Sequence, residues 1–363
     1  MRIAHFETLK PVCPRCKVER QSISPLVIAN VTDQQDDMII DGILRCQDNR
    51  CLAQFPIIDG IPIIFNNIHQ YINDNFYQIT VRSDLSSTAE AILGDIAGPG
   101  SDFNRMRHYL SMYCWDHYGD KAPEGEFGHL SEKTVPGSLV NCLNAGMTLL
   151  KDKPGAPMID IGCAVGRCTF ELAANNPGLI LGIDLNFSLL RIAQHILREN
   201  HVTFPLRRSG VVYDRHQYGV EFENKECVDF WACDALAPPF ESDSFYFANC
   251  LNVFDAVSAP RKLLVAIRNI LKTGGKAILA TPYDWTPPTP MQNWVGGHSQ
   301  LGPEGGAPEP LVRQMLSPQE NPQAVKDLFL VGEIEHHPWD LRIHNRHTAS
   351  YSVHIFACEK SGR

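Results

Sequence analysis

Short apolar runs alternate with amphipathic stretches through the carboxyl-terminal part of the chain. One apolar run ends at Asp160, passes through two glycines and becomes an amphipathic stretch that reaches Ala173. Further runs end at Asp184 and Asp234, a fourth carries Asn252, and a fifth follows a pair of glycines at 274–275. Short buried strands that alternate with helical segments are typical of a doubly wound sheet. The pattern therefore predicts an α/β domain over residues 151–363.

The first part of the chain has a different pattern, in which β-rich runs surround two close pairs of cysteines. Residues 54–65 form two such runs that meet at Asp59-Gly60, a strong signal for a hairpin turn. The cysteine pairs have the spacing of a zinc ribbon, whose four thiolates form a closed tetrahedral site for structural Zn²⁺. The predicted ligands are Cys13, Cys16, Cys46 and Cys51. The alternative is that all four are unligated core cysteines.

Residues 69–150 separate these two regions, so we expect three parts: a zinc module at 1–68, a helical linker or lid at 69–150 and the α/β domain. Within the middle part, residues 102–118 carry aromatic and apolar side chains at helical spacing. Such a helix either covers a ligand as a lid or packs against a core, and periodic aromatic residues more often belong to a core. Both interpretations stay open.

Composition narrows the class of protein. The chain has 363 residues, of which 44% are hydrophobic and 20% charged, and a formal net charge of −9. This charge disfavours non-specific binding to nucleic acid and makes a small-molecule substrate more plausible than a nucleic acid. No apolar run approaches the length of a membrane helix, and the first residues lack the apolar core of a signal peptide. We therefore expect a cytoplasmic protein that does not enter membranes.

The loop after the first predicted strand indicates which cofactor the domain binds. Gly162 lets the backbone approach a ligand and Gly166 permits close helix packing, with Cys163 between them. Asp160 precedes this turn, where a carboxylate would repel the pyrophosphate of NAD but suits the ammonium of S-adenosylmethionine. The spacing therefore favours S-adenosylmethionine over a dinucleotide.

The ends of the other strands complete this prediction. Ligands of open α/β sheets bind at the carboxyl ends of the strands. Asp184, followed by Leu185, is placed to accept hydrogen bonds from the ribose hydroxyls. Asp234 and Ala235 can bind the adenine, and Asn252 lies under the cofactor.

Two later segments are candidates for the substrate side. The loop at 281–298 is rich in proline and aromatic residues, and it offers Tyr283, Asn293 and Trp294 to orient a methyl acceptor. Residues 335–360 contain many histidines, but the strand-like alternation after Ser350 disfavours a metal site there. In this segment Arg342 and Arg346 could bind a substrate carboxylate, or they could form surface salt bridges.

The cysteine pattern together with Phe55-Pro-Ile-Ile-Asp-Gly-Ile-Pro62 resembles the small zinc-binding activator subunit of tRNA and protein methyltransferases. The order of motifs after residue 150 is similar to that of the class I S-adenosylmethionine-dependent methyltransferases. This resemblance implies a Rossmann-like sheet of seven strands.

A narrower resemblance rests on five segments, which begin at Asp160, Phe230, Thr281, Asn293 and Leu341. Together they are similar to the carboxyl-terminal methyltransferase half of ovothiol-forming synthases, which implies transfer of a methyl group to an imidazole nitrogen of a histidine-like or thiolhistidine-like compound. The chain departs from that family in two ways: it shows no iron-dependent sulfur-insertion domain, and Ile343 stands where an acidic residue is expected.

Two other hypotheses compete with a small-molecule N-methyltransferase. One is a methyltransferase that acts on nucleic acid or protein, with the zinc module as a recognition or scaffold domain. The other is a scaffold protein whose nucleotide fold no longer binds cofactor. The acidic balance of the chain disfavours nucleic acid, and the retained Asp160, Gly162 and Asp184 disfavour a vestigial site.

Overall fold

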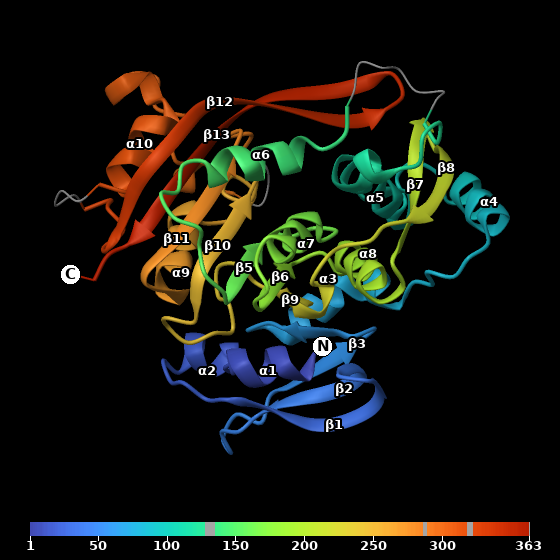
Figure 1. Cartoon of the computed structure of the whole chain (residues 1–363), viewed down its shortest axis with the longest axis horizontal. Coiled ribbons are helices and arrows are strands. Elements are labelled where there is room, and N and C mark those ends of the chain that lie inside the picture. Colours follow the sequence, from blue (N-terminus) through green and yellow to red (C-terminus); the bar gives the residue numbers. More distant parts are fainter. Residues whose placement is uncertain (128–134, 286–288, 318–321, 363) are drawn as a thin grey trace.

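The structure is a computed structural model that describes residues 1–127, 135–285, 289–317 and 322–362 (Figure 1). Its helices are α1 (Ile3–Leu9), α2 (Pro14–Glu19), α3 (Ile68–Thr80), α4 (Ser87–Ala97), α5 (Asp102–Tyr118), α6 (Ser138–Met147), α7 (Arg167–Ala174), α8 (Phe187–Glu199), α9 (Pro260–Ile270) and α10 (Pro308–Met315). Its strands are β1 (Leu26–Gln35), β2 (Met38–Cys46), β3 (Gln54–Ile58), β4 (Ile61–Ile64), β5 (Met158–Ile161), β6 (Ile180–Asp184), β7 (His201–Ser209), β8 (Val212–Gly219), β9 (Val228–Cys233), β10 (Phe245–Leu251), β11 (Leu271–Thr281), β12 (Leu328–His344) and β13 (His347–Lys360).

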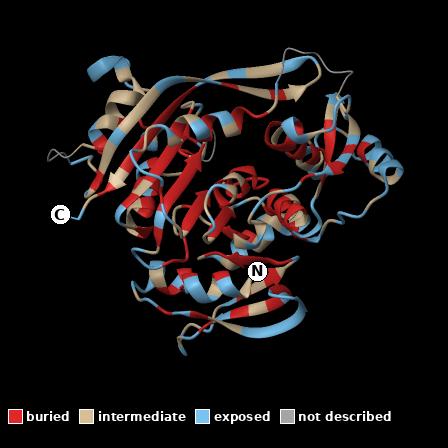
Figure 2. Ribbon diagram, viewed as in Figure 1, coloured by how far each residue is buried: buried red, intermediate tan, exposed pale blue. Residues whose placement is uncertain are grey.

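The carboxyl-terminal part forms the predicted seven-stranded sheet. Its strand order is β9-β6-β5-β10-β11-β13-β12, and the first five of these strands run parallel. β13 is antiparallel to both of its neighbours. The central strands are mostly apolar, as expected for strands covered on both faces, and Figure 2 shows them buried. The expected Rossmann-like α/β fold is confirmed.

The amino-terminal strands extend this same sheet. β1 to β4 form antiparallel pairs, and the predicted turn between β3 and β4 is present, with positive φ at Asp59 and Gly60. β4 then pairs in parallel with β9, so that Ile63 is opposite Ala232. The sheet therefore continues through eleven strands, from the cysteine-containing part into the catalytic part.

Polar contacts also join the two parts. His5 on α1 is buried, and its Nε2 lies 3.0 Å from the carbonyl oxygen of Cys227. Lys17 on α2 donates through Nζ to the carbonyl oxygen of Pro238 at 3.0 Å. These bonds fix the amino-terminal helices below the edge of the central sheet (Figure 1).

The long β12–β13 hairpin crosses the opposite side of the molecule and reaches toward the β7–β8 hairpin (Figure 1). α5 packs against both β7 and β12, and α6 packs against β12 and β13. These segments stand over the carboxyl ends of the parallel strands and so form the roof of the site described next.

Candidate functional site

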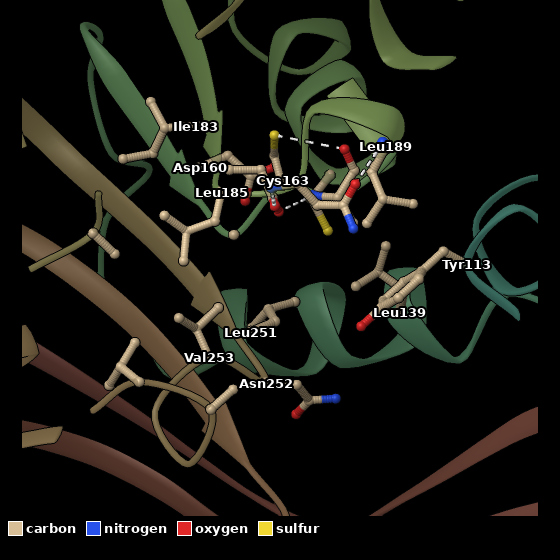
Figure 3. Close-up of a pocket in the computed structure, with 18 of the residues that line it drawn as sticks. Tyr113, Leu139, Asp160, Cys163, Ile183, Leu185, Leu189, Leu251, Asn252 and Val253 are labelled. Atoms are coloured by element: carbon tan, nitrogen blue, oxygen red, sulfur yellow. Dashed lines mark hydrogen bonds between the residues drawn. The ribbon is translucent and has the colours of Figure 1, made fainter. Parts of the chain in front are cut away.

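A cavity of about 570 Å³ lies at the carboxyl ends of β5, β6, β9 and β10. Its other walls come from α5, the start of α6 and the β12–β13 hairpin. Figure 3 shows Asp160, Cys163 and Leu185 on one side and Tyr113 with Leu139 on the other. The volume is within the range of small-ligand sites, and the position is the one at which open α/β sheets bind ligands.

Asp160 belongs to β5 and is almost completely buried at this edge. Its Oδ2 accepts a hydrogen bond from Thr169 Oγ1 at 2.7 Å, and its Oδ1 accepts one from Asn249 Nδ2 at 2.7 Å. Burial raises the pKa of the Asp160 carboxyl to about 6, and the two hydrogen bonds oppose this rise. The carboxyl is thus held in one orientation while it still lines the cavity.

The turn after β5 requires glycine at two positions. Gly162 has φ +74, and a Cβ there would lie 2.2 Å from Cγ2 of Val253. Gly166 has φ +86, and a Cβ there would lie 2.6 Å from the ring of Phe230. A side chain at either position would therefore be strained and would collide with a neighbour. Gly162 lines the cavity. Gly166, the N-cap of α7, lets this helix begin close to Phe230 and Ala193.

The carboxylate of Asp184 ties this turn to the end of β6. Its Oδ2 accepts from the backbone N–H of Ala164 at 2.8 Å, and its Oδ1 accepts from that of Asn186 at 2.7 Å. Burial raises the pKa of Asp184, whereas these N–H groups lower it. Leu185, which is half exposed, continues the wall of the cavity.

The remaining predicted cofactor residues, Cys163, Asp234, Ala235 and Asn252, also line the cavity. Asp234 Oδ1 accepts from the N–H of Leu236 at 2.8 Å, which fixes the carboxylate beside the end of β9. Asn252 has φ +55, and its buried Oδ1 has no hydrogen-bond partner. The cavity therefore contains an acceptor atom that a bound donor could satisfy.

The five side chains predicted to position the substrate lie elsewhere. Tyr283 bonds to Nδ1 of His354 at 2.6 Å, although its neighbours Pro282 and Asp284 do line the cavity. Asn293 is exposed and donates to the carbonyl oxygen of Ser258 at 2.8 Å. Trp294 stacks on Trp285, with ring centroids 5.8 Å apart. Residues 286–288 of the same loop are outside the described residues.

The two arginines are also outside the cavity lining. Arg342 is buried, and its Nη2 donates to the carbonyl oxygen of Arg207 at 2.8 Å. Its Cζ lies 5.3 Å from the ring centroid of Trp115. Burial lowers the pKa of Arg342 to about 10. Arg346 is exposed at the turn of the β12–β13 hairpin. Neither arginine is among the residues that line the cavity, so the structure gives no contact between them and a ligand there.

Several cavity residues that sequence reasoning did not select come from α5 and the β12–β13 hairpin. They are Tyr109, Tyr113, Asp116, His117, Trp339, Leu341 and Tyr351. The aromatic spacing of residues 102–118 was a signal for α5. This helix packs into the core through Cys114 and Tyr118, and others of its residues line the cavity. Burial lowers the pKa of His117 to about 3, so its imidazole is neutral near pH 7.

The four predicted zinc ligands come together in the amino-terminal part. Cys13 Sγ lies 3.9 Å from Cys51 Sγ, and Cys16 Sγ lies 3.7 Å from Cys46 Sγ. Tetrahedral coordination with Zn–S bonds of ~2.3 Å separates the sulfur atoms by ~3.8 Å. None of these four cysteines forms a disulfide. The cluster thus fits a structural zinc ion.

The histidine-rich carboxyl-terminal segment forms no such cluster among the described residues. His354 Nε2 lies 3.1 Å from Glu333 Oε2, and its other ring nitrogen bonds to Tyr283. In the parts of the chain that the structure describes, no helix has the length and apolar character needed to cross a bilayer.

Comparison with known proteins bears on the same region. The model of the family described as "Methyltransferase domain" matches residues 159–279, about a third of the chain, and this range contains the turn after β5 and the ends of β6, β9 and β10. Residues 159–279 form a methyltransferase domain. The cofactor site of this domain fits S-adenosylmethionine, because carboxylates rather than an anion-binding turn surround it. A comparison with curated proteins gives no match.

Several solved structures are similar to this chain at low identity and low TM-score. A Haemonchus contortus phosphoethanolamine N-methyltransferase 2, in complex with phosphomonomethylethanolamine and S-adenosylhomocysteine, is 22% identical with a TM-score of 0.32 and covers 48% of this chain. This chain spans 36% of that protein. The [4+2]-cyclase SpnF is 13% identical with a TM-score of 0.40, covering 64% of this chain and 85% of its own.

A complex between the Haloferax volcanii Trm112 methyltransferase activator and a protein described as a methyltransferase is 12% identical, with a TM-score of 0.39. It covers 61% of this chain and 89% of the matched one. At these scores the similarities to solved structures identify no acceptor for this chain.

Proposed function

We propose that the protein is an S-adenosylmethionine-dependent N-methyltransferase whose acceptor is a small molecule with an imidazole-like nitrogen, such as a histidine-like or thiolhistidine-like compound. The observation that carries this proposal is a single cavity with two unlike halves. One half holds Asp160, Asp184 and Asp234 at the ends of parallel strands beside the glycine turn. The other half combines aromatic side chains from α5 and the β12–β13 hairpin with further aspartates.

In this proposal the cofactor occupies the half with Asp160, Asp184 and Asp234. Asp184 accepts from the ribose hydroxyls, and Asp234 with Ala235 binds the adenine beside Leu185. Gly162 and Cys163 approach the amino-acid end of the cofactor, near Asp160. Gly166 acts indirectly, by letting α7 support the turn.

Methyl transfer to nitrogen needs alignment of the reacting atoms and a free lone pair more than strong acid–base catalysis. When bound, S-adenosylmethionine supplies a sulfonium methyl group that a nitrogen nucleophile can displace. A neutral imidazole has a lone pair at pH 7, since its ordinary pKa is ~6.5. The new N–C bond forms as the S–C bond breaks, and the ring then loses its N–H proton.

The protein's own residues can orient such a ring and receive that proton. Tyr113, Trp339 and Tyr351 offer flat surfaces in the acceptor half. Asp116 lines the cavity with an Oδ1 that has no hydrogen-bond partner, and burial raises the pKa of its carboxyl to about 7. Oδ1 of Asp116 is thus suited to accept the N–H of the acceptor.

The residues predicted from sequence for the substrate side act at a distance in this proposal. Tyr283, Asn293 and Trp294 hold the loop from which Pro282 and Asp284 reach the cavity. Arg342 supports the hairpin against Trp115, so its role is positioning rather than direct binding of a carboxylate. Arg346 is exposed and receives no role.

The test is incubation of the full chain with methyl-labelled S-adenosylmethionine and separate acceptors: histidine, thiolated histidine, small peptides and total RNA. We expect label in a small imidazole compound, with mass spectrometry placing the methyl group on a ring nitrogen. Label found only in RNA or peptide would overturn the small-molecule acceptor and favour the alternative. No label in any acceptor, together with no heat on titration of the cofactor, would overturn the enzyme itself.

A further inference from the structure

The acceptor half of the cavity has an unusual charge distribution. Among the described residues that line the whole cavity, six are aspartates and none is lysine or arginine. His117 adds no positive charge, because burial lowers its pKa to about 3. S-adenosylmethionine brings only one net positive charge, and in our proposal it binds beside Asp160, Asp184 and Asp234. The carboxylates of the other half, Asp116, Asp255 and Asp284, therefore lack a cation.

Asp255 and Asp284 form a connected pair at the ends of β10 and β11. Asp255 is 4% exposed, and its Oδ2 accepts from the backbone N–H of Asp284 at 2.7 Å. Burial raises the pKa of Asp255, and the charge of Asp284 raises it further. The side chain of Asp284 is more exposed than that of Asp255 and faces the same cavity. Two adjacent carboxylates in a partly enclosed site favour a bound cation.

Aromatic rings join this pair to the third carboxylate. Burial and then the charge of Asp284 raise the pKa of the Tyr351 hydroxyl. Burial, and after it the charge of Asp184, raises the pKa of Tyr113 to about 12. Both tyrosines line the same cavity as Asp284 and Asp116. Aromatic faces attract ammonium groups through their quadrupoles.

A buried oxygen atom without a partner points to a ligand that donates hydrogen bonds. Oδ1 of Asp116, on a residue that is 2% exposed, lacks a partner, and Asp116 lines the cavity. Leaving such an acceptor unsatisfied costs ~1–3 kcal/mol. A ligand with N–H groups would satisfy it, whereas a carboxylate or phosphate has only acceptor oxygens to offer.

We infer that this half of the cavity is a cation site, so that the enzyme selects acceptors with a protonated amino group and rejects those whose charge is carried by a carboxylate or phosphate. The ammonium binds beside Asp255 and Asp284, against the rings of Tyr113, Tyr351 and Trp339. This inference rests on the proposed function, since it places the acceptor in the half that the cofactor leaves free. It also differs from binding of a substrate carboxylate by Arg342.

The experiment measures binding without turnover. The full chain is saturated with S-adenosylhomocysteine and titrated by calorimetry with histamine, histidine, imidazole-4-acetate and 2-phenylethylamine. At pH 8 the imidazole rings are neutral, while the amino group of histamine keeps its charge. We expect histamine to bind at least ~10-fold more tightly than imidazole-4-acetate, because a ~10-fold difference in affinity corresponds to one modest charge-assisted hydrogen bond. The affinity of histidine should lie between these two.

Variants locate the effect. Asp284→Asn should weaken histamine by roughly 10-fold and should not weaken imidazole-4-acetate, because loss of a negative charge reduces the repulsion of its carboxylate. Asp152→Asn, which neutralises a carboxylate whose side chain is 85% exposed, should change neither. Equal affinities across the series, a preference for imidazole-4-acetate, or no binding of any compound would overturn the inference.

The two proposals fail separately. If histamine and 2-phenylethylamine bind equally and label is never transferred to an imidazole, the cation site holds and the imidazole acceptor is wrong. If label is transferred to imidazoles and imidazole-4-acetate is the best of them, the methyltransferase holds and the cation site is wrong.

Discussion

In the cysteine cluster, thiols face one another at 3.7 and 3.9 Å, whereas the cavity keeps polar atoms such as Oδ1 of Asp116 and Asn252 without partners. Both regions are assembled where strands and helices end. The cluster is closed around a point the size of one ion and offers no open coordination position. The cavity is open and carries the cost of unsatisfied groups. The cysteine cluster therefore stabilises the fold, whereas the cavity is built to bind a ligand.

We expect the largest effect, on zinc content and stability, from a substitution that removes a zinc ligand. Cys16→Ser should reduce bound zinc to near zero and lower the free energy of unfolding by ~3 kcal/mol or more, because metal binding and folding are coupled in such clusters. Metal analysis combined with thermal melting provides the measurement. Cys227→Ser, a control outside the cluster, should keep the zinc. Full zinc content in the Cys16 variant would contradict the assignment of Cys16 as a ligand. The cysteine cluster could then no longer be contrasted with the cavity as a closed metal site.

The next effect concerns the open region. Asp184→Ala should weaken S-adenosylmethionine by about 100-fold, since two hydrogen bonds to a charged acceptor contribute ~3 kcal/mol together. Calorimetric titration measures the affinity, and thermal melting checks that loss of the bonds from Ala164 and Asn186 leaves the protein folded. Asp152→Ala serves as the control. Unchanged affinity in the Asp184 variant would refute its role in the cofactor site.

A pair of glycine variants separates backbone strain from steric clash. Gly162 and Gly274 have nearly the same φ, +74 and +75, but a Cβ at Gly274 would meet nothing within 4 Å. Gly274→Ala should cost about 1 kcal/mol from strain alone. Gly162→Ala should cost ~2 kcal/mol more because its methyl group would displace Val253. Denaturant unfolding measures the loss in free energy of unfolding for each variant. Equal losses would mean that the turn after β5 shifts to accommodate the methyl group at little cost.

The smallest effect is a pH dependence. Burial raises the pKa of Asp160 from 3.8 to about 6, so between these values the folded protein binds more protons than the unfolded chain. The free energy of unfolding should therefore fall as pH rises through this interval, with a contribution of at most ~1.4 kcal/mol per pH unit from this group. Asp160→Asn should flatten the dependence by about that amount. An identical slope in both proteins would show that Asp160 titrates normally.

The strands of the parallel sheet, the glycine turn and the cysteine ligands could be predicted from sequence because each depends on neighbours in the chain. A run of apolar residues makes a buried strand, and its last residue reaches the carboxyl edge of the sheet whatever the rest of the chain does. For the same reason Asp160, Asp184 and Asp234 could be named before their surroundings were known. Two pairs of cysteines with short spacing likewise specify a metal cluster with little further information.

The acceptor half was decided only by tertiary structure. Asp116 and Tyr351 are separated by more than two hundred residues and meet because α5 packs under the β12–β13 hairpin. Nor does any local pattern show that β4 would pair with β9 and join the zinc module to the catalytic sheet. Tyr283 and Arg342 were reasonable choices by residue type, but the loop and the hairpin orient them elsewhere. Such long-range packing sets which side chains share a cavity, and periodicity along the chain carries no record of it.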